Sequence, residues 1–324
     1  MMNNQRVLIT GGLGFIGSNL AHTCVQLGAK VTIYDCLDPR SGGNIHNIEE
    51  IAGSVTLISG DIGDFEPLCA AILNQDLVFS CAAHTSHPYS MKDPLVDIDV
   101  NCKGVINILE AMRRFNREAK LVHIGTSTQI GKMKTNPVDE SHSEFPLDIY
   151  SANKSVSEKY VLIYGSAYGM RTTVIRLANV FGPRACVNSR DLGFMSFFVG
   201  LALKDAELPV FGQGTQLRNI CYIDDSVRAL ILAAQAEQSC GEVYFATSES
   251  QFTLAEIATE ISQVIGGRVK FVEWPAERQA IEVGDAVIAN GKIKAHLGWV
   301  PEYTLSEGLQ RTSAFYAARR ERYL

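Results

Sequence analysis

Residues 6–20 read RVLITGGLGFIGSNL, an apolar run that leads into three glycines spaced three residues apart. RVLIT predicts a buried β-strand, and residues 15–28 predict an α-helix. The first glycine of such a turn permits a tight bend, the second lets the backbone approach a pyrophosphate, and the third allows close packing of helix on strand. The N–H groups that begin the helix then face the anion. We therefore expect a dinucleotide-binding turn at Gly11, Gly14 and Gly17.

An acidic residue, Asp35, ends the next predicted strand, 18 residues beyond Gly17. A carboxylate at this position accepts hydrogen bonds from the adenosine ribose hydroxyls and repels a 2′-phosphate, so we expect NAD in preference to NADP. Small residues at the end of the fourth strand would let the backbone pass close to the cofactor, although core packing explains them equally well. The remaining residues expected at the cofactor are Phe15, Ile16, Asp61, Ile62, Ala82, Ala83 and Asn101.

Apolar strand-like runs alternate with helical stretches through the first half of the chain. This alternation predicts an α/β fold, a doubly wound parallel sheet with helices on both faces. The predicted strands are 6–10, 30–35, 55–59, 77–83, 120–126 and 172–180. The predicted helices are 15–28, 64–74, 98–115 and 151–168.

The second half is less regular and predicts a smaller α/β domain interleaved with the first. LPVFGQGTQLRNICYIDD (208–225) is expected to form a hairpin or two short strands around a glycine-rich turn. Thr253 and Glu256 form a capping-box pattern at the start of a helix. We expect a dinucleotide-binding domain over 1–180, with 218–247 returning to it, and a substrate domain over 181–217 and 248–324.

Composition and charge narrow the functional classes. The 324 residues are 46% hydrophobic and 20% charged, with a formal net charge of −6, which is not the basic footprint of a protein that binds nucleic acid or anionic membrane. No segment reaches about 18 uninterrupted apolar residues, and the N-terminus lacks a signal-peptide pattern. The eight cysteines are scattered, without metal-ligand spacing. We expect a cytoplasmic, reduced and metal-free protein.

The stretch DIYSANKSVSEKY (148–160) places Tyr150 and Lys154 four residues apart, on one face of a predicted helix. By itself this spacing fits a packed ring beside a solvated ammonium. A phenol has a reference pKa of about 10, but an ammonium and the positive nicotinamide would lower that pKa and release a phenolate base. Thr126, at the carboxyl end of the strand 120–126, would hold the reacting oxygen, or would only cap the chain.

Together these motifs resemble the extended short-chain dehydrogenase/reductase superfamily (a Rossmann fold), in its nucleotide-sugar epimerase/dehydratase branch. The matching segments are TGGLGFIGSNL, DIGD, AAHTSHPYSMKDP, NCKGVINILEA, YSANK, RLANVFGPR, GQGTQLRNICYIDD and LGWVP, spread over nearly the whole chain. The resemblance implies bound NAD and a catalytic triad of Thr126, Tyr150 and Lys154. Helices 98–115 and 151–168 resemble the pair that forms a four-helix dimer interface, which implies a homodimer.

On the substrate side, the resemblance implies that Asn179 and Arg218 contact the diphosphate of a nucleotide sugar. An acidic residue of AIEVGDAV would hold the nucleotide ribose, Glu282 in preference to Asp285. Arg278 would be a second phosphate ligand, although Arg278 and Glu282 could equally be surface charges. The other expected substrate contacts are Ser86, Thr126, Ser127, Thr128, Val210 and Phe211. The sequence departs from the family pattern at Asn219, where aspartate is usual.

The residues after Thr126 bear on the reaction. The 4,6-dehydratases of this branch carry Asp-Glu there, and the UDP-glucuronate decarboxylases carry a Glu at the second position, but this chain has Ser127 and Thr128. The expected activity is therefore C4 inversion of a UDP-hexose through a 4-keto intermediate, with hydride returned from tightly bound NADH. Alternatives are a 4-ketosugar reductase, a C2 epimerase of the CDP-tyvelose type, for which His84 and His87 leave room, or a non-enzymatic relative. A 4,6-dehydratase or decarboxylase is a further alternative, which Ser127 and Thr128 disfavour.

Overall fold

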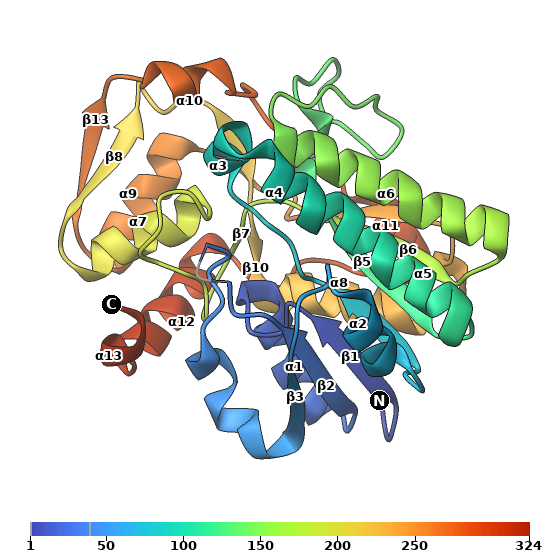
Figure 1. Cartoon of the computed structure of the whole chain (residues 1–324). Helices are drawn as coiled ribbons and strands as arrows, with labels where there is room; N and C mark the ends of the chain where they lie inside the picture. Colours follow the sequence, from blue (N-terminus) through green and yellow to red (C-terminus); the bar gives the residue numbers. More distant parts are fainter. Residues whose placement is uncertain (1, 39) are drawn as a thin grey trace.

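The structure is a computed structural model that describes residues 2–38 and 40–324. At its centre lies a seven-stranded sheet with the order β11-β6-β5-β4-β1-β2-β3, in which every pair of neighbours is parallel (Figure 1). Its strands are β1 (Arg6–Thr10), β2 (Lys30–Asp35), β3 (Val55–Ser59), β4 (Leu77–Ser80), β5 (Lys120–Thr126), β6 (Thr172–Leu177) and β11 (Val243–Ala246). The strand order reverses beside β1, and this confirms the predicted doubly wound sheet.

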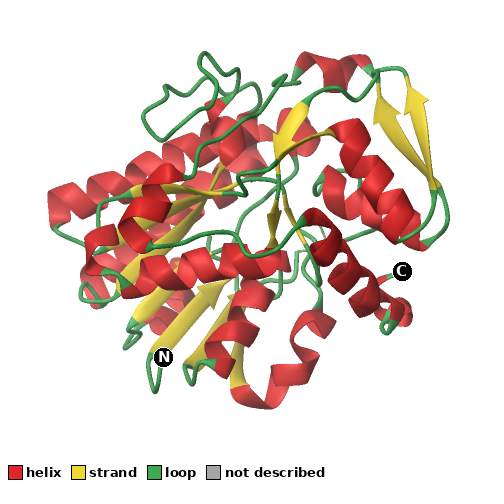
Figure 2. Cartoon of the chain, turned by 180° about the vertical axis from the view of Figure 1, so that it is seen from behind, coloured by secondary structure: helices red, strands yellow, loops and turns green. Residues whose placement is uncertain are grey.

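Helices cover both faces of the sheet because successive strand side chains point to opposite sides. Val7 and Ile9 of β1 belong to one hydrophobic cluster, with α1 and α8, whereas Leu8 belongs to a second, with α2, α5 and α6. Figure 2 shows the sheet between its helices from behind. These helices are α1 (Phe15–Gln26), α2 (Phe65–Ile72), α5 (Val105–Phe115), α6 (Ile149–Tyr168) and α8 (Ile223–Gln235).

Several short elements connect the main strands and helices. A 3-10 helix, η1 (Ile45–Ser54), precedes β3, and another, η3 (Ser127–Ile130), follows β5. The helix expected over 98–115 is instead α4 (Pro94–Ile98), a π-helical turn (Asp99–Gly104) and α5. The strand expected over 77–83 ends at Ser80, and the chain continues as a loop to α3 (His87–Lys92).

The remaining elements lie mostly at the left of Figure 1, apart from α11 (Gly291–Leu297), which lies at the right. They include three small sheets, in which β8 (Glu207–Phe211) pairs with β13 (Arg268–Val272), β9 (Leu217–Asn219) with β12 (Gln251–Thr253), and β7 (Val180–Phe181) with β10 (Cys221–Tyr222). The other helices are α7 (Phe194–Leu203), η4 (Glu237–Ser239, 3-10), α9 (Leu254–Val264), α10 (Ala276–Ala280), α11 (Gly291–Leu297), α12 (Leu305–Ala317) and α13 (Arg320–Tyr323).

One expectation for this region is corrected, and two are confirmed. Of the two forms expected over 208–225, the structure has two short strands, β8 and β9, around a glycine-rich turn; the hairpin does not form, because each strand pairs with a later strand. The strand 172–180 is interrupted by Asn179, whose φ of 42° breaks the extended chain. The capping box at α9 is present, since the Glu256 amide donates to Thr253 Oγ1 over 3.1 Å and the Thr253 amide donates to Glu256 Oε2 over 2.8 Å.

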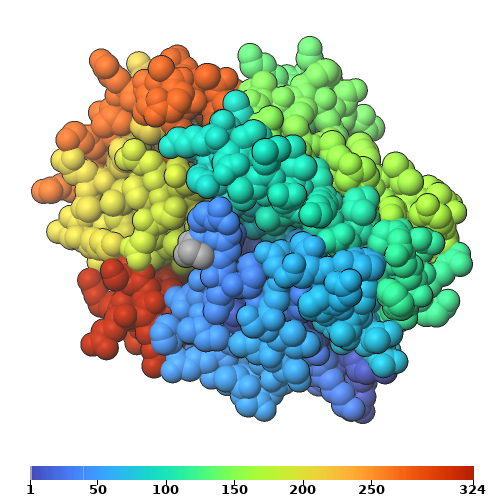
Figure 3. Space-filling view, in the orientation of Figure 1, coloured from blue at the N-terminus to red at the C-terminus, as the bar shows by residue number. Residues whose placement is uncertain are grey.

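One hydrophobic cluster runs from β1 to α13, so the two halves of the chain share a core. The space-filling view shows the blue N-terminal segments meeting teal and yellow segments near the middle of one face (Figure 3). Within the described residues, no helix combines the length and the apolar character needed to cross a membrane. In the same residues, no group of His, Cys, Asp and Glu is arranged to hold a metal ion.

Candidate active site

The glycine turn brings three backbone segments so close that side chains would not fit. Gly11 has a φ of +68°, and a Cβ there would lie 2.6 Å from the Ala82 backbone. A Cβ on Gly17 would lie 2.3 Å from the Gly11 carbonyl oxygen. Helix α1 begins without a side-chain cap at Gly14 and without an acidic residue in its first turn. Its free N–H groups and partial positive charge therefore fit a dinucleotide phosphate.

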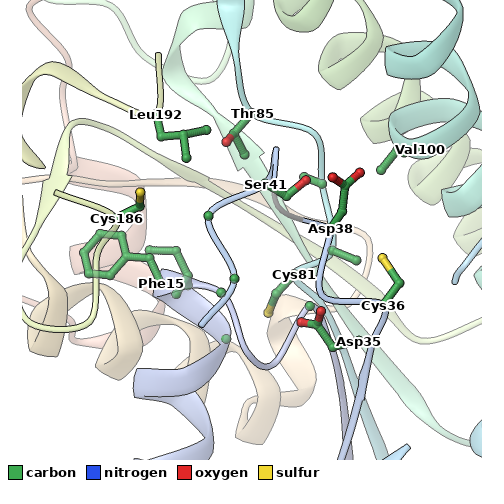
Figure 4. Close-up of a pocket in the computed structure, with 18 of the residues that line it drawn as sticks. Phe15, Asp35, Cys36, Asp38, Ser41, Cys81, Thr85, Val100, Cys186 and Leu192 are labelled. Carbon is green, nitrogen blue, oxygen red and sulfur yellow. The ribbon is translucent and has the colours of Figure 1, made fainter. Parts of the chain in front are cut away.

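A pocket opens beside this turn, at the carboxyl ends of β1, β2 and β4. In Figure 4, Asp35, Cys36 and Asp38 lie on one side of it, and Phe15 and Cys186 on the other. Ten of the residues expected at the cofactor line it: Gly11, Gly14, Phe15, Ile16, Gly17, Asp35, Asp61, Ile62, Ala82 and Ala83. The structure thus brings these ten expected residues together around one pocket.

Asp35 is held in place by backbone donors, since its carboxylate accepts hydrogen bonds from the amides of Leu13 over 2.9 Å and Leu37 over 2.8 Å. The expected cofactor residue Asn101 does not line the pocket. Its buried amide donates to the His84 carbonyl over 2.8 Å and to Asp97 Oδ1 over 3.0 Å. These hydrogen bonds fix the loop after β4, and a contact of Asn101 with the cofactor stays a prediction.

Sequence reasoning missed part of this pocket. The missed lining residues are Tyr34, Cys36, Asp38, Ser41, Gly42, Gly43, Gly60, Thr85, Val100, Ala185, Cys186, Leu192 and Ser196. Those around Asp35 and Ala82 adjoin predicted residues and could have been inferred from that proximity. Ala185, Cys186, Leu192 and Ser196 come from the other half of the chain, where no local pattern marks them.

Thr126 and Tyr150 meet where β5 ends and α6 begins. Burial raises the pKa of the Tyr150 phenol, and the hydrogen bond with the Thr126 hydroxyl acts in the opposite direction. Thr126 Oγ1 lies 3.1 Å from Thr128 Oγ1, which accepts a 3.0 Å hydrogen bond from the Ser151 hydroxyl. The Thr126 amide donates to Gln129 Oε1 over 3.3 Å. The hydroxyl of Thr126 is thereby fixed beside the phenol.

Lys154 lies one helical turn after Tyr150 and is also buried. Its ammonium donates to the Ile124 carbonyl over 2.5 Å, and its Nζ lies 3.3 Å from His123 Nε2. Burial lowers the pKa of Lys154 to about 8, while the nearby thiol of Cys81, on the pocket wall, acts to raise it. The ammonium was expected to lower the pKa of Tyr150, but in the protein alone burial dominates and that pKa is raised.

The loop after β4 carries two histidines with different surroundings. His84 is buried, with Nδ1 3.3 Å from Asp97 Oδ2. His87 is partly exposed, and its Nδ1 lies 2.8 Å from Asp148 Oδ2. The His87 ring stands edge-on to the Tyr150 ring, with 4.7 Å between centroids. The nearby Ser86 is buried and caps α3, accepting from the Tyr89 amide over 3.2 Å.

Most of the residues expected at a nucleotide are engaged with the protein itself. Arg218 is buried and forms a 2.7 Å ion pair with Glu282, so these two expected ligands are adjacent. Arg278 pairs with Asp191 over 2.5 Å. The Asn179 amide donates to the Asn219 carbonyl over 2.7 Å.

The expected contacts to the base lie on β8, where neighbouring residues face opposite ways. Val210 is buried in the core, whereas Phe211 is partly exposed and packs against Trp274, with 5.1 Å between ring centroids. Sequence reasoning missed Trp274, which is distant in the chain. The unusual Asn219 is buried and both accepts from the Ile288 amide over 2.7 Å and donates to the Ser248 carbonyl over 3.0 Å. An ionised aspartate has no donor for the second bond.

Comparisons with known proteins identify the family of this chain. Residues 7–246 match the model of the NAD dependent epimerase/dehydratase family. A Methanocaldococcus jannaschii protein, provisionally named UDP-glucose 4-epimerase, is 30% identical over 94% of this chain and 96% of its own length. The UDP-N-acetyl-alpha-D-glucosaminuronate decarboxylase of Bacillus cytotoxicus is 31% identical over 96% of this chain and 98% of its own.

Among solved structures, the UDP-N-acetylglucosamine 4-epimerase of Methanobrevibacter ruminantium, in complex with UDP-N-acetylmuramic acid, is 26% identical to this chain. The alignment covers 98% of this chain and 100% of that one, with a TM-score of 0.90. Three findings lead to one conclusion. They are the match of the family model over most of the sequence, the glycine turn, and the buried Tyr150 and Lys154 beside the partly buried Thr126. The chain belongs to the NAD dependent epimerase/dehydratase family, whose members act on nucleotide sugars with NAD as cofactor.

Proposed function

We propose that this enzyme inverts C4 of a UDP-hexose. The observation that carries the proposal is the pairing of a buried Tyr150 with a partly buried Thr126, followed by hydroxyl side chains, not carboxylates, at Ser127 and Thr128. Inversion needs a group that removes and returns the proton of the C4 hydroxyl, and it needs no second acid or base.

Each residue of the triad has a distinct part in this proposal. NAD, which the residues around the glycine turn and Asp35 would hold, would supply the hydride transfer. Tyr150 removes the proton of the sugar C4 hydroxyl and later returns it, while the Thr126 hydroxyl holds the same oxygen. Lys154, anchored to the Ile124 carbonyl, keeps a positive charge near the phenol and so favours the phenolate.

The positions that serve other reactions are occupied by structural hydroxyls. Thr128 hydrogen-bonds to Thr126 and Ser151, and Ser127 is buried. Neither can perform the acid and base steps that a carboxylate performs in loss of water or of carbon dioxide. Because decarboxylases and dehydratases are as similar to this chain as epimerases are, this local difference is what favours inversion.

For the substrate, we favour a UDP-sugar, because relatives named as UDP-sugar enzymes align over nearly the whole chain. Asn179 and Arg218 would contact the diphosphate, and Glu282 would contact the ribose. When the substrate binds, Arg218 would give up part of its ion pair with Glu282. Its guanidinium would instead form two parallel hydrogen bonds to phosphate oxygens, a geometry that the planar group favours. Phe211, beside Trp274, would offer an aromatic surface to the base.

The test is NMR of the products formed from a panel of UDP-, dTDP-, CDP- and GDP-sugars. We expect inversion at C4 for at least one UDP-hexose, without net change in NAD. Tyr150→Phe removes the base but keeps the ring, and is expected to lower the rate by at least about a hundredfold. A product that has lost water or carbon dioxide would refute the proposal.

A further inference from the structure

A second titratable pair adjoins the catalytic tyrosine. His87, at the start of α3, and Asp148, which precedes α6, are 61 residues apart in sequence, yet His87 Nδ1 and Asp148 Oδ2 are separated by only 2.8 Å. The same two elements are joined by the Tyr150 amide, which donates to Ser90 Oγ over 3.0 Å. The imidazole therefore has a defined place against the Tyr150 ring, and C4 inversion has no use for it.

Asp148 is built to orient this histidine. Its side chain is only 5% exposed and also caps α6, accepting from the Ser151 amide over 2.8 Å. Burial alone would raise the pKa of Asp148, but the hydrogen bond and charge of His87 and the Ser151 donors outweigh burial, and the pKa is lowered. An ionised carboxylate only accepts, so Nδ1 of His87 must carry the hydrogen. In the neutral ring, Nε2 is then the basic nitrogen.

The basic nitrogen is available for chemistry. The His87 side chain is 32% exposed, and in the part of the chain that the structure describes no group hydrogen-bonds to Nε2. Two residues earlier, Thr85 lines the dinucleotide pocket. An imidazole in this position can reach a sugar whose C4 oxygen is held by Tyr150, and it can exchange its proton with water.

We infer that His87, oriented by Asp148, is a second acid/base group that moves the proton on a carbon next to the sugar C4 carbonyl. This inference rests on the proposed function, which creates that carbonyl. The C–H bond breaks, its proton passes to Nε2, and its electron pair forms the C=C bond of an enolate. The buried Tyr150 phenol stabilises the enolate oxygen by donating a hydrogen bond. The reverse transfer delivers a proton from solvent to the same carbon.

The test uses a preformed ketone, UDP-4-keto-6-deoxyglucose, incubated in D₂O with the NAD-loaded protein. Exchange on this probe needs no hydride step, and the absent 6-hydroxyl means that deprotonation at C5 cannot expel a group from C6. We expect deuterium at C3 or C5, detected by NMR and mass spectrometry. His87→Asn should slow this exchange about a hundredfold or more, since general acid–base catalysis typically contributes 10²–10⁴-fold.

His87→Asn keeps a side-chain N–H that can donate to Asp148 but removes the atom at Nε2, so it separates proton transfer from packing. His46→Asn, the same change at an exposed histidine of η1, is the matched control and should leave exchange unchanged. Asp148→Asn keeps the cap of α6 but no longer selects the Nδ1–H form, and it should slow exchange at least about tenfold. Thermal unfolding of all three variants checks the fold.

Equal exchange in the native protein and His87→Asn would overturn the inference, as would exchange no faster than without protein. C4 inversion is measured separately with UDP-hexoses, and His87→Asn should retain it within a few fold. Inversion without His87-dependent exchange contradicts only this inference. His87-dependent exchange without inversion of any sugar supports the acid/base role of His87 and Asp148 and contradicts the proposed function.

Discussion

At the scale of single residues, the Lys154 ammonium is not solvated, as its spacing from Tyr150 alone would allow, but faces the buried side chain of His123. His123 is fully buried, its Nδ1 lies 3.1 Å from Ser80 Oγ, and its Nε2 faces Lys154. Burial keeps the pKa of His123 well below its ordinary value, and the Lys154 charge adds to this effect. The ring is therefore neutral, and its Nε2 accepts a hydrogen bond from the ammonium.

A pH dependence follows from the lowered pKa of Lys154. Because this pKa is about 8, the ammonium is lost as the pH rises through that value, and reduction of NAD by the sugar should fall there. In His123→Leu the ammonium loses an acceptor worth about 1 kcal/mol, so the fall should shift to lower pH by about 0.7 units. The other titratable groups that act on Lys154 are Cys81, Asp97, Glu158 and Cys102.

The measurement is the pH profile of single-turnover NAD reduction. His123→Gln is the conservative control, because its amide oxygen can still accept from Lys154, and its profile should stay close to that of the native protein. If the profile of His123→Leu were unchanged, His123 would be a packing residue only.

At the scale of an element, the glycine turn fixes the distance between α1 and β1. The atoms that a Cβ on Gly17 would meet are the Gly11 carbonyl oxygen at 2.3 Å and Gly12 Cα at 2.8 Å, which are backbone atoms and cannot rotate away. The close approach also aims the start of α1 at the phosphates. Stability and cofactor binding are therefore coupled in this element.

We expect Gly17→Ala to destabilise the protein by about 1–3 kcal/mol, the usual cost of overpacking, and to lower the NAD content of the purified enzyme. Gly53→Ala is the matched control, since no heavy atom lies within 4 Å of a Cβ there. That variant should stay within about 0.5 kcal/mol of the native protein. Thermal unfolding and quantification of NAD after denaturation provide both readouts. Full NAD content in Gly17→Ala would contradict this account.

At the scale of the whole molecule, an exposed apolar surface supports the expected homodimer. Helices α5 and α6 lie side by side in Figure 1. Val156 and Ile163 of α6 are 38% and 53% exposed, and Phe115 at the end of α5 is 51% exposed. Large apolar side chains gathered on neighbouring helices are typical of an interface.

We expect Ile163→Glu to convert the dimer into a monomer, because dimerisation would bury an unpaired charge. Phe271→Glu, at a similarly exposed apolar residue of β13, should leave the native assembly unchanged. Sedimentation velocity over a range of protein concentrations distinguishes these outcomes. A native protein that remains monomeric throughout, or an Ile163→Glu variant that remains dimeric, would rule out this interface.

The amino-acid sequence by itself determined the features that depend on neighbouring residues. Strand and helix patterns predicted the doubly wound sheet, and the spacing of Gly11, Gly14 and Gly17 with Asp35 predicted where the dinucleotide pocket lies. These predictions succeeded because turn geometry, periodicity and helical spacing are local properties of the chain. Of the two forms predicted over 208–225, the two short strands are present and the hairpin is not, because strand pairing depends on edges that the rest of the chain supplies.

Only the tertiary structure decided which distant residues meet. It placed Ala185 and Cys186 on the cofactor pocket, paired Arg218 with Glu282, and set His87 against Asp148. The tertiary structure also decided which side chains are buried. That burial raises the pKa of Tyr150 and lowers the pKa of Lys154. Such contacts arise from the packing of whole elements, which brings together side chains that no local pattern connects.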